Sequence, residues 1–495
     1  MQLSTKHPAG QMVEYADFTG GLNTAVSVEG IAQNELAVAV NVTIDKGTGL
    51  LRTVYGFDRV AYDSSITFDC LMYDKASKTV LVTDTASTLY RVDSGVFQPV
   101  GRLTGRNHAR YANWEDGILI SSGGRLQYYH GGTLETISES PSNCNGVFVR
   151  DGRVWTWSGT NIYLSEAGNE HGWSTDTNAL SSAQWVEVGY KDTGNISCVV
   201  PTLSMVLVFK DGGNMYRIDG QFPSWQATLI ATQIPLDNSD CCISIGSGVT
   251  ALGGRKLRSV TGNEYGDMQA QSLSEKVQSD VASYGSASRI RYVSKDNSIW
   301  IMERGKSQAL VYDVALGSFF YHQYTTEVLD VMSVGEDVYT LRAHSLCVRN
   351  QNALMVDEGA SLPWAFECKA LSSQNYLLLT RIIADTTPLF EQDSIDQRFW
   401  VGGVMLNGSV PHDGTLWDRH LWSKSTLLTA PLESEPSGDN KFASFIRGSH
   451  SYIRTPKTYR AECRCVDRRR ALRVRAEGSG GATMFNRIAA IVAEV

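Results

Sequence analysis

The sequence contains no long apolar run. No stretch approaches the ~18 consecutive apolar residues that a membrane-spanning helix needs, and residues 1–12 lack the apolar core of a signal peptide. We therefore expect no membrane-spanning segment, synthesis in the cytoplasm, and no secretion by the signal-peptide route.

Cysteine and positive charge are scarce as well. The nine cysteines are odd in number and scattered over 495 residues, unlike the dense framework of a disulfide-stabilised domain, so we expect reduced thiols. Lys plus Arg number 44 against 52 Asp plus Glu, which gives a net charge of -8. This charge argues against attraction of the whole surface to nucleic acid or to an anionic membrane, so any phosphate binding must be local.

Motifs of known catalytic and metal sites are missing too. The nine histidines are scattered without an HExxH motif, and no two cysteines have CxxC spacing. The sequence has no Gly-x-Ser-x-Gly nucleophile elbow and no phosphate-binding loop ending in Gly-Lys-Ser/Thr. Asp151, Asp211 and Asp296 lie in predicted hairpin turns, where aspartate is common for structural reasons. We therefore predict no catalytic residue, no metal site, no cofactor and no enzymatic activity.

The composition favours a packed β protein. Hydrophobic residues make up 42% of the chain and charged residues 19%, as in globular rather than disordered proteins. At roughly 100 to 200 residues per domain, the length suggests about two to four domains. Helical periodicity is scarce, whereas short runs of β-branched and aromatic residues, bounded by turn residues, recur from about residue 60 to residue 350.

One local pattern returns seven times in this region. It consists of a short apolar strand, a turn, and a second strand that often ends in Tyr-Arg-(Val/Ile)-Asp, as in Tyr90–Asp93 and Tyr216–Asp219. The average spacing of about 43 residues suits one four-stranded blade of a β-propeller. The first apolar residues of the seven copies lie at positions 80, 118, 154, 206, 249, 299 and 338.

A single hairpin cannot bury its apolar face in water, so the repeated units must stack, and circular closure protects their edges. We therefore predict an all-β fold with a six- or seven-bladed β-propeller. An elongated sandwich of meandering hairpins remains the structural alternative, because the same alternation of apolar and polar residues permits it.

The two ends of the chain do not share the repeat. We predict an N-terminal segment (1–58), the propeller (59–351) and a C-terminal β-rich platform domain (352–495). The N-terminal segment is too short for a domain of its own, so we expect it to pack on the C-terminal domain and complete the platform. Two helices are predicted, a short one at Asn34–Val40 and a longer one at Gln271–Tyr284, where several apolar residues share one face.

Positive charge is concentrated near the C-terminus. Residues 446–475 include ten basic and two acidic residues, a net charge of +8, which leaves -16 on the rest of the chain. Alternation predicts two strands, Tyr459–Cys465 and Leu472–Ala476, with Asp467–Arg470 at the connection. The candidate subunit or adaptor interface consists of Arg460, Arg464, Arg468, Arg469, Arg470, Arg473 and Arg475.

This arginine row is suited to binding carboxylates of another subunit or phosphates of DNA. Few aromatic residues interleave with the arginines, as a base-stacking groove would require, so a protein contact is favoured over DNA. A solvated or internally paired strand face remains the structural alternative.

Several segments resemble a known protein family. Tyr15–Thr24, Glu35–Val42 and Leu51–Phe57 together resemble the start of the tail nozzle proteins of short-tailed bacteriophages, also called tail tubular protein B or packaged-DNA stabilisation protein. Weaker similarity lies in Asn161–Asn169 and in the ending from Leu472 to Val495. The resemblance extends over most of the chain but is specific only in roughly the first 45 residues.

The resemblance implies a β-propeller with a β platform, assembled as a six-fold ring below the portal and an adaptor protein. Such a ring extends the DNA channel, retains packaged DNA and serves as a docking site for tail fibres or spikes. Its implied location is the virion tail, after synthesis in the host bacterial cytoplasm. A mainly acidic chain suits passive passage of double-stranded DNA, because a basic lining would bind the polyanion tightly.

Two other functions remain open. A carbohydrate-binding or sugar-cleaving propeller of a receptor-binding spike would need a pocket of aromatic and carboxylate residues on one propeller face, and sialidase-type Asp boxes are absent. An intracellular scaffold propeller would be a monomer with an exposed binding face.

Overall fold

The computed structural model describes residues 10–174, 183–262, 268–350, 355–388, 396–401, 404–407, 427–429, 459–479 and 483–494. The chain divides into two compact units. The propeller unit comprises Arg59–Ser307 and Thr326–Val348, and the platform unit comprises Met1–Asp58, Gln308–Thr325 and Arg349–Val495. Gln308–Thr325, which lies inside the predicted propeller range, thus groups with the platform. Within the described ranges, none of the helices combines the length and the hydrophobicity required to span a bilayer.

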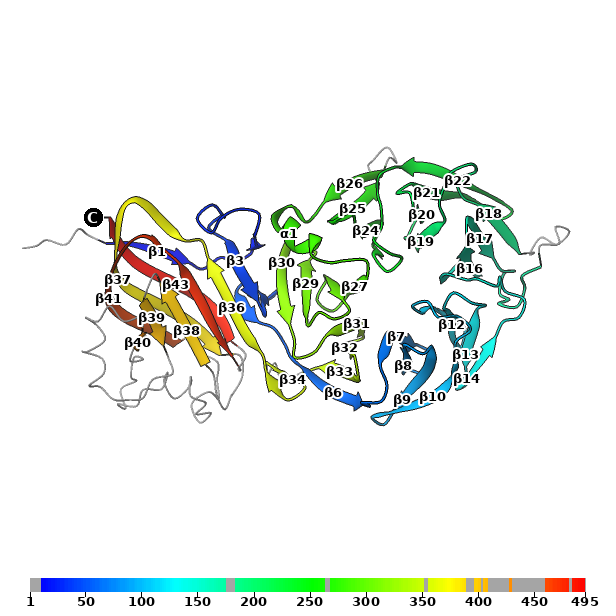
Figure 1. The fold of residues 1–495 in the computed structure, drawn as a ribbon, viewed down its shortest axis with the longest axis horizontal. Coiled ribbons are helices and arrows are strands. Elements are labelled where there is room, and N and C mark those ends of the chain that lie inside the picture. The colour runs from blue at the N-terminus through cyan, green and yellow to red at the C-terminus, as the bar shows by residue number, and fades with distance from the viewer. Residues whose placement is uncertain are drawn as a thin grey trace, which may run out of the picture. The chain divides into compact units, whose positions relative to one another are not determined.

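The propeller unit consists of antiparallel sheets arranged in a circle (Figure 1). Among the described residues it contains seven hairpins, each made by the first two strands of one sheet. The prediction of an all-β propeller is confirmed.

The strands of the first three sheets are β7 (Phe68–Asp74), β8 (Thr79–Asp84), β9 (Thr88–Asp93) and β10 (Val96–Arg102); β11 (Arg110–Trp114), β12 (Gly117–Ser121), β13 (Gln127–His130) and β14 (Thr133–Thr136); and β15 (Val147–Arg150), β16 (Arg153–Ser158), β17 (Asn161–Leu164) and β18 (Gln184–Glu187).

The remaining sheets of this unit follow the same order. They contain β19 (Ile196–Pro201), β20 (Val206–Lys210), β21 (Met215–Gln221) and β22 (Ser224–Ala231); β23 (Cys242–Ile245), β24 (Gly248–Gly253), β25 (Lys256–Gly262) and β26 (Met268–Ser272); the hairpin of β27 (Ser288–Val293) and β28 (Ser298–Glu303); and β31 (Val328–Val334), β32 (Asp337–Arg342) and β33 (Ser345–Arg349). The last sheet is completed by β6 (Phe57–Tyr62), which precedes all the others in the chain and lies next to β33.

The seven repeat starts predicted from the sequence all lie on the second strand of a sheet, from β8 to β32. These strands are apolar runs because neighbouring sheets cover both of their faces. Every residue of β12, β20 and β24 is buried, whereas β14 and β22 contain only exposed and half-buried residues. The core therefore consists of layers between adjacent sheets, such as the layer where Met72 and Leu81 pack with Ile118 and Ile120.

The platform unit contains two main sheets. The first has the order β4-β5-β43-β37-β41, with β1 also paired to β43, and the second includes the order β3-β36-β42-β38-β39-β40, with β2 and β30 paired to β3. A small hairpin, β34–β35, completes the unit. Its strands are β1 (Gln11–Tyr15), β2 (Gly21–Leu22), β3 (Glu35–Val40), β4 (Val42–Ile44), β5 (Leu51–Thr53), β29 (Gln308–Asp313), β30 (Ser318–Gln323), β34 (Val356–Asp357), β35 (Ala360–Ser361), β36 (Pro363–Cys368), β37 (Leu371–Pro388), β38 (Asp396–Val401), β39 (Val404–Asn407), β40 (Leu427–Thr429), β41 (Tyr459–Leu472), β42 (Val474–Ser479) and β43 (Thr483–Glu494).

Aromatic rings from both ends of the chain form the core of the platform. Phe485 on β43 lies 4.7 Å from Trp364 and 4.9 Å from Phe366, both on β36, between ring centroids. Phe18 contacts Phe366 at 5.7 Å. Because the N- and C-terminal segments share sheets as well as this core, the predicted composite platform is confirmed.

The predicted helix at Asn34–Val40 is wrong: the segment is strand β3. Its backbone pairs antiparallel with β36, for example Ala39 with Phe366. In a short apolar segment, sheet pairing and burial override weak helix propensity.

The second predicted helix is shorter than Gln271–Tyr284. A 3-10 turn, η1 (Glu275–Val277), leads into helix α1 (Gln278–Ala282), while the first two predicted residues belong to β26. The predicted apolar face is buried through Val277 and Val281.

Candidate functional site

Strand β41 carries five of the seven arginines of the predicted interface: Arg460, Arg464, Arg468, Arg469 and Arg470. In register, Arg464 lies opposite Arg381 and Arg460 lies opposite Asp385 on β37. The side chains at 460, 464, 468 and 469 lie outside the described residues. The structure therefore aligns these five positions along one strand.

The predicted connection at Asp467–Arg470 is wrong. Pairing with the long strand β37 keeps β41 extended through this segment, with Asp467 opposite Leu379 and Arg469 opposite Leu377. The chain changes sheet at Arg473, and Arg475 lies on β42 in the second platform sheet. The predicted row is thus divided between two sheets.

The three arginines with described side chains have partners within the platform. Arg470 lies over the Tyr376 ring at 5.4 Å, and the Nε of Arg473 lies 3.5 Å from the Glu367 carboxylate. Arg475 pairs with Glu477 at 2.9 Å. The Arg473 side chain is still 68% exposed, so solvent weakens its ion pair.

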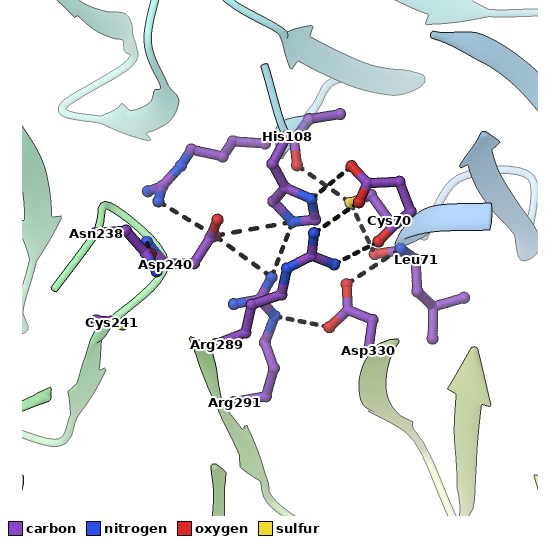
Figure 2. Close-up of polar contacts among 12 residues, drawn as sticks. Cys70, Leu71, His108, Asn238, Asp240, Cys241, Arg289, Arg291 and Asp330 are labelled. Atoms are coloured by element: carbon purple, nitrogen blue, oxygen red, sulfur yellow. Dashed lines mark hydrogen bonds and ion pairs between the residues drawn. The ribbon is translucent and has the colours of Figure 1, made fainter. Parts of the chain in front are cut away.

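A second group of charges converges where the first strands of the propeller sheets meet (Figure 2). We call it the axial hub. It contains three arginines, three aspartates and one histidine, so the arginine and aspartate charges cancel. Its members come from β7, β11, β27 and β31 and from the turns before β11 and β23: Asp69, His108, Arg110, Asp240, Arg289, Arg291 and Asp330.

Asp69 is the acceptor for several donors. Arg289 donates to it at 2.6 Å, Arg304 at 2.8 Å, and the Nδ1 of His108 lies 2.9 Å away. Burial opposes ionisation of Asp69, but the hydrogen bond from His108 and the charge of Arg289 outweigh it and hold the pKa of this carboxyl well below its usual range. Asp69 is therefore ionised at neutral pH.

Arg291 links the two other carboxylates. Its Nε donates to Asp330 at 2.8 Å, and its Nη2 lies 3.5 Å from Asp240. Asp240 also accepts a hydrogen bond from Arg110 at 3.2 Å. Burial again opposes ionisation, but the electrostatic effects of His108, Arg110 and Arg291 hold the pKa of Asp240 far below its usual range. Carboxylates held ionised in this way accept hydrogen bonds but are poor general acids at neutral pH.

One group among the described residues has metal-ligand spacing: atoms of Cys70, His108 and Asp330 all lie within 4.8 Å of one another. Each of them already has a partner. Asp330 accepts from Arg291 and from the Leu71 N–H, His108 lies between Asp69 and Arg291, and the Cys70 thiol donates to the Ala109 carbonyl. Burial also raises the pKa of the Cys70 thiol well above its usual value. A cation would have to displace a guanidinium, so these residues do not fit a metal site.

A cavity of about 220 Å³ adjoins the axial hub. Arg110, Asp240 and Arg291 form its polar wall, and the apolar wall includes Phe148 and Trp157. Gly146 makes room for this indole, because a Cβ at Gly146 would lie 1.9 Å from the Trp157 ring. The hub and this cavity occupy the region where the first strands meet.

A second pocket, of about 300 Å³, lies on the third sheet and the loops beside it. Tyr163 and Trp173 supply aromatic surface, and Glu139 and Gln184 supply polar groups. The hydrogen bond from Ser138 lowers the pKa of Glu139, which makes this carboxylate an acceptor rather than a general acid.

The axial hub was not predicted from the sequence, although the sequence contains a pattern that indicates it. Arg289-Ile290-Arg291 places two charges on one face of a strand whose central residue is buried, and Asp330 interrupts an apolar run on β31. Charges inside apolar strands require partners. The identity of those partners depended on which strands meet, which a local pattern does not reveal.

The chain is similar in fold to solved β-propeller structures. No family model and no curated protein matches the chain. Among solved structures, the WD40 domain of Neurospora crassa Pan2 is 7% identical, with a TM-score of 0.42, and the match covers 61% of this chain and 96% of that domain. The β-propeller domain of Myceliophteria thermophila Cps50 (Swd1) is 9% identical, with a TM-score of 0.40 and coverage of 59% and 99%. YCF48 from Cyanidioschyzon merolae is 11% identical, with a TM-score of 0.40 and coverage of 59% and 98%. At this level of identity the similarity concerns the fold alone.

Proposed function

We propose that this protein is a structural subunit of the tail nozzle of a short-tailed bacteriophage, which assembles as a ring that extends the DNA channel, retains packaged DNA and docks fibres or spikes. The proposal begins from the sequence resemblance of Tyr15–Thr24, Glu35–Val42 and Leu51–Phe57 to that family. The implied host compartment is the bacterial cytoplasm, and the implied final location is the virion tail.

The observation that carries this proposal is the composite platform. The segments that resemble the family at the start of the chain contain β2, β3 and β5, the last residue of β1 and the first residue of β4, and the ending from Leu472 contributes β42 and β43. These strands share sheets: Tyr15 pairs with Ile488, and Arg52 pairs with Met484. The segments at the two ends of the chain that resemble the family thus belong to one compact unit, as expected for a docking platform.

The packing of the propeller supports a ring rather than a single-chain conduit. The axial hub and a cavity of about 220 Å³ fill the region where the first strands meet, a space far too small for a DNA duplex. A channel for DNA would therefore have to be formed between several copies of the chain. In this proposal the arginines of β41 and β42 contact a neighbouring copy or the adaptor.

Electron microscopy of the purified full chain, alone and mixed with the adaptor ring of the same phage, tests the proposal. The expected result is a hollow closed ring in at least the mixture. The variant Arg473→Glu reverses an exposed charge and is expected to weaken ring formation, while Lys295→Glu on the propeller is the matched surface control. Particles that stay monomeric in both samples would contradict the proposal.

The pocket on the third sheet favours a second candidate function, carbohydrate binding by a receptor-recognition protein. Trp173 and Tyr163 offer apolar faces for sugar rings, while Glu139 and Gln184 offer hydrogen-bonding groups. Among the described residues that line this pocket Glu139 is the single carboxylate, which suits binding better than glycosidic cleavage. A glycan array with the wild type and Trp173→Ala tests this candidate. It predicts a signal that the variant loses, and the absence of any signal would contradict it.

A further inference from the structure

Two cysteine thiols meet between neighbouring sheets of the propeller. Cys198 on β19 and Cys242 on β23 belong to one apolar cluster, and both lie beside Arg110, which contacts the Cys198 Sγ and lines the same cavity as Cys242. Cys198 is 1% exposed and Cys242 is 8% exposed. The seven cysteines among the described residues are all free thiols, so this pair is reduced in the structure.

The environment of the pair is asymmetric. The Nη1 of Arg110 lies 3.6 Å from the Sγ of Cys198, where its positive charge favours a thiolate. The interaction with the Cys242 side chain, together with Arg110, outweighs burial and the negative charge of Asp240 and lowers the pKa of Cys198 to about 7. Burial instead raises the pKa of Cys242 well above its usual value. Cys198 therefore ionises first, while Cys242 remains a proton donor beside it.

The cavity beside the axial hub gives small molecules a space next to Cys242 and next to Arg110, the residue that contacts Cys198. Cys242 and Arg110 both line it. Its volume of about 220 Å³ exceeds several times the share of one water in the liquid, about 30 Å³. A molecule the size of hydrogen peroxide fits in this space.

Other described cysteines have environments that suppress reactivity. Burial raises the pKa of Cys144 to about 11 and that of Cys241 to about 12. These thiols are therefore fully protonated at neutral pH and serve as internal references for the reactivity of Cys198.

We propose that Cys198 and Cys242 form an oxidation site, at which a peroxide converts the two thiols into a disulfide that links the fourth and fifth sheets of the propeller. The Cys198 thiolate attacks one peroxide oxygen, the O–O bond breaks, and the departing hydroxide takes up a proton to leave as water. The Cys242 sulfur then attacks the resulting sulfenic acid, the S–O bond breaks, and the second water leaves with the Cys242 proton. Two thiols are oxidised to one disulfide and one hydrogen peroxide is reduced to two waters. This inference does not depend on the proposed nozzle function.

The test uses the reduced full chain, treated with hydrogen peroxide at pH 7, denatured, alkylated and mapped by mass spectrometry. The expected product is a cross-linked pair of peptides containing Cys198 and Cys242, lighter than the two thiol peptides by two hydrogen atoms and separated again by reductant. Cys198→Ala should abolish this product, and Cys144→Ala, a matched truncation of another buried thiol, should leave it unchanged. Full alkylation of both cysteines after peroxide treatment of the folded wild type would overturn the proposal.

Arg110 is a positioning residue in this reaction, and its role is read from the pH profile of oxidation. For the wild type the rate should rise with an inflection near pH 7, whereas Arg110→Met should move the inflection upward and lower the rate at pH 7 by about tenfold. Arg110→Lys, which keeps the charge, should restore most of the rate. A wild-type inflection at the ordinary thiol pKa of about 8.5 would overturn this role, and that measurement does not require the variants to fold.

Discussion

The molecule contains two arginine-rich regions that differ in the way their charges are placed. The segment from Arg460 to Arg475 is dense in the sequence, but the structure spreads it along β41 and into a second sheet. The arginines of the axial hub are sparse in the sequence, yet they converge on three aspartates from different sheets. Density of charge along a chain is therefore a poor guide to density of charge in space.

The two regions also differ in energetic terms. The hub arginine Arg291 has a side chain that is 23% exposed, whereas the Arg473 side chain is 68% exposed; their acidic partners, Asp330 and Glu367, are 2% and 5% exposed. Removing one partner of a buried ion pair leaves an uncompensated charge, whereas exposed pairs contribute little. The following predictions test this contrast.

The largest effect is expected for Arg291→Met. This variant leaves the buried Asp330 carboxylate without its guanidinium and should lower the free energy of unfolding by about 3 to 5 kcal/mol. Urea denaturation followed by tryptophan fluorescence measures it, since Trp157 lies beside the hub cavity. A loss as small as that of Arg473→Met would remove the contrast between the two regions.

A double-mutant cycle sharpens the same point. Asp330→Asn alone should cost about 2 to 3 kcal/mol, because the carboxylate accepts from both Arg291 and the Leu71 N–H. The double variant Arg291→Met/Asp330→Asn should be more stable than the sum of the single losses predicts, by about 1 kcal/mol or more. Strictly additive losses would show that the two side chains act independently.

The contribution of Asp69 to the free energy of unfolding should decrease as the pH falls. Because the pKa of Asp69 is held below its unfolded value of about 3.9, its contribution is fully present above that pH and is lost as the pH falls through the folded pKa. Asp69→Asn should therefore be less stable than the wild type by about 2 kcal/mol at pH 6, and this difference should shrink at pH 3. Unfolding free energies of both proteins at the two pH values provide the measurement; a difference independent of pH would refute the electrostatic explanation.

The smallest effect is expected for Arg473→Ala. Glu367 is itself only 5% exposed, but the pair is long at 3.5 Å and water reaches the Arg473 guanidinium, so the free energy of unfolding should fall by about 1 kcal/mol, less than for the hub variants. The nozzle proposal adds that the same variant impairs ring formation, which sedimentation velocity measures. A large loss of stability with intact assembly would reverse both expectations.

Most of the architecture was predictable because it depends on local patterns. The seven repeat starts are apolar runs because each second strand is covered on both faces, and the chain repeats that pattern for every sheet. The failures have a common cause in pairing between distant segments. Strand β3 takes its conformation from β36, and β41 remains extended through Asp467–Arg470 because β37 pairs with it. The hub was missed for the same reason, since Asp69 and Arg289 become neighbours only when their sheets meet.

The late partners of the first strands have a consequence for biosynthesis. β6 joins the last sheet of the propeller beside β33, and β1 pairs with β43. During synthesis, β6 and β1 therefore have no strand to pair with until β33 and β43 have left the ribosome. Such long-range pairing slows folding and leaves strand edges exposed in the meantime. A chain terminated before β33 completes neither unit, and one terminated between β33 and β43 lacks a complete platform, which excludes truncated copies from any assembly that requires both units.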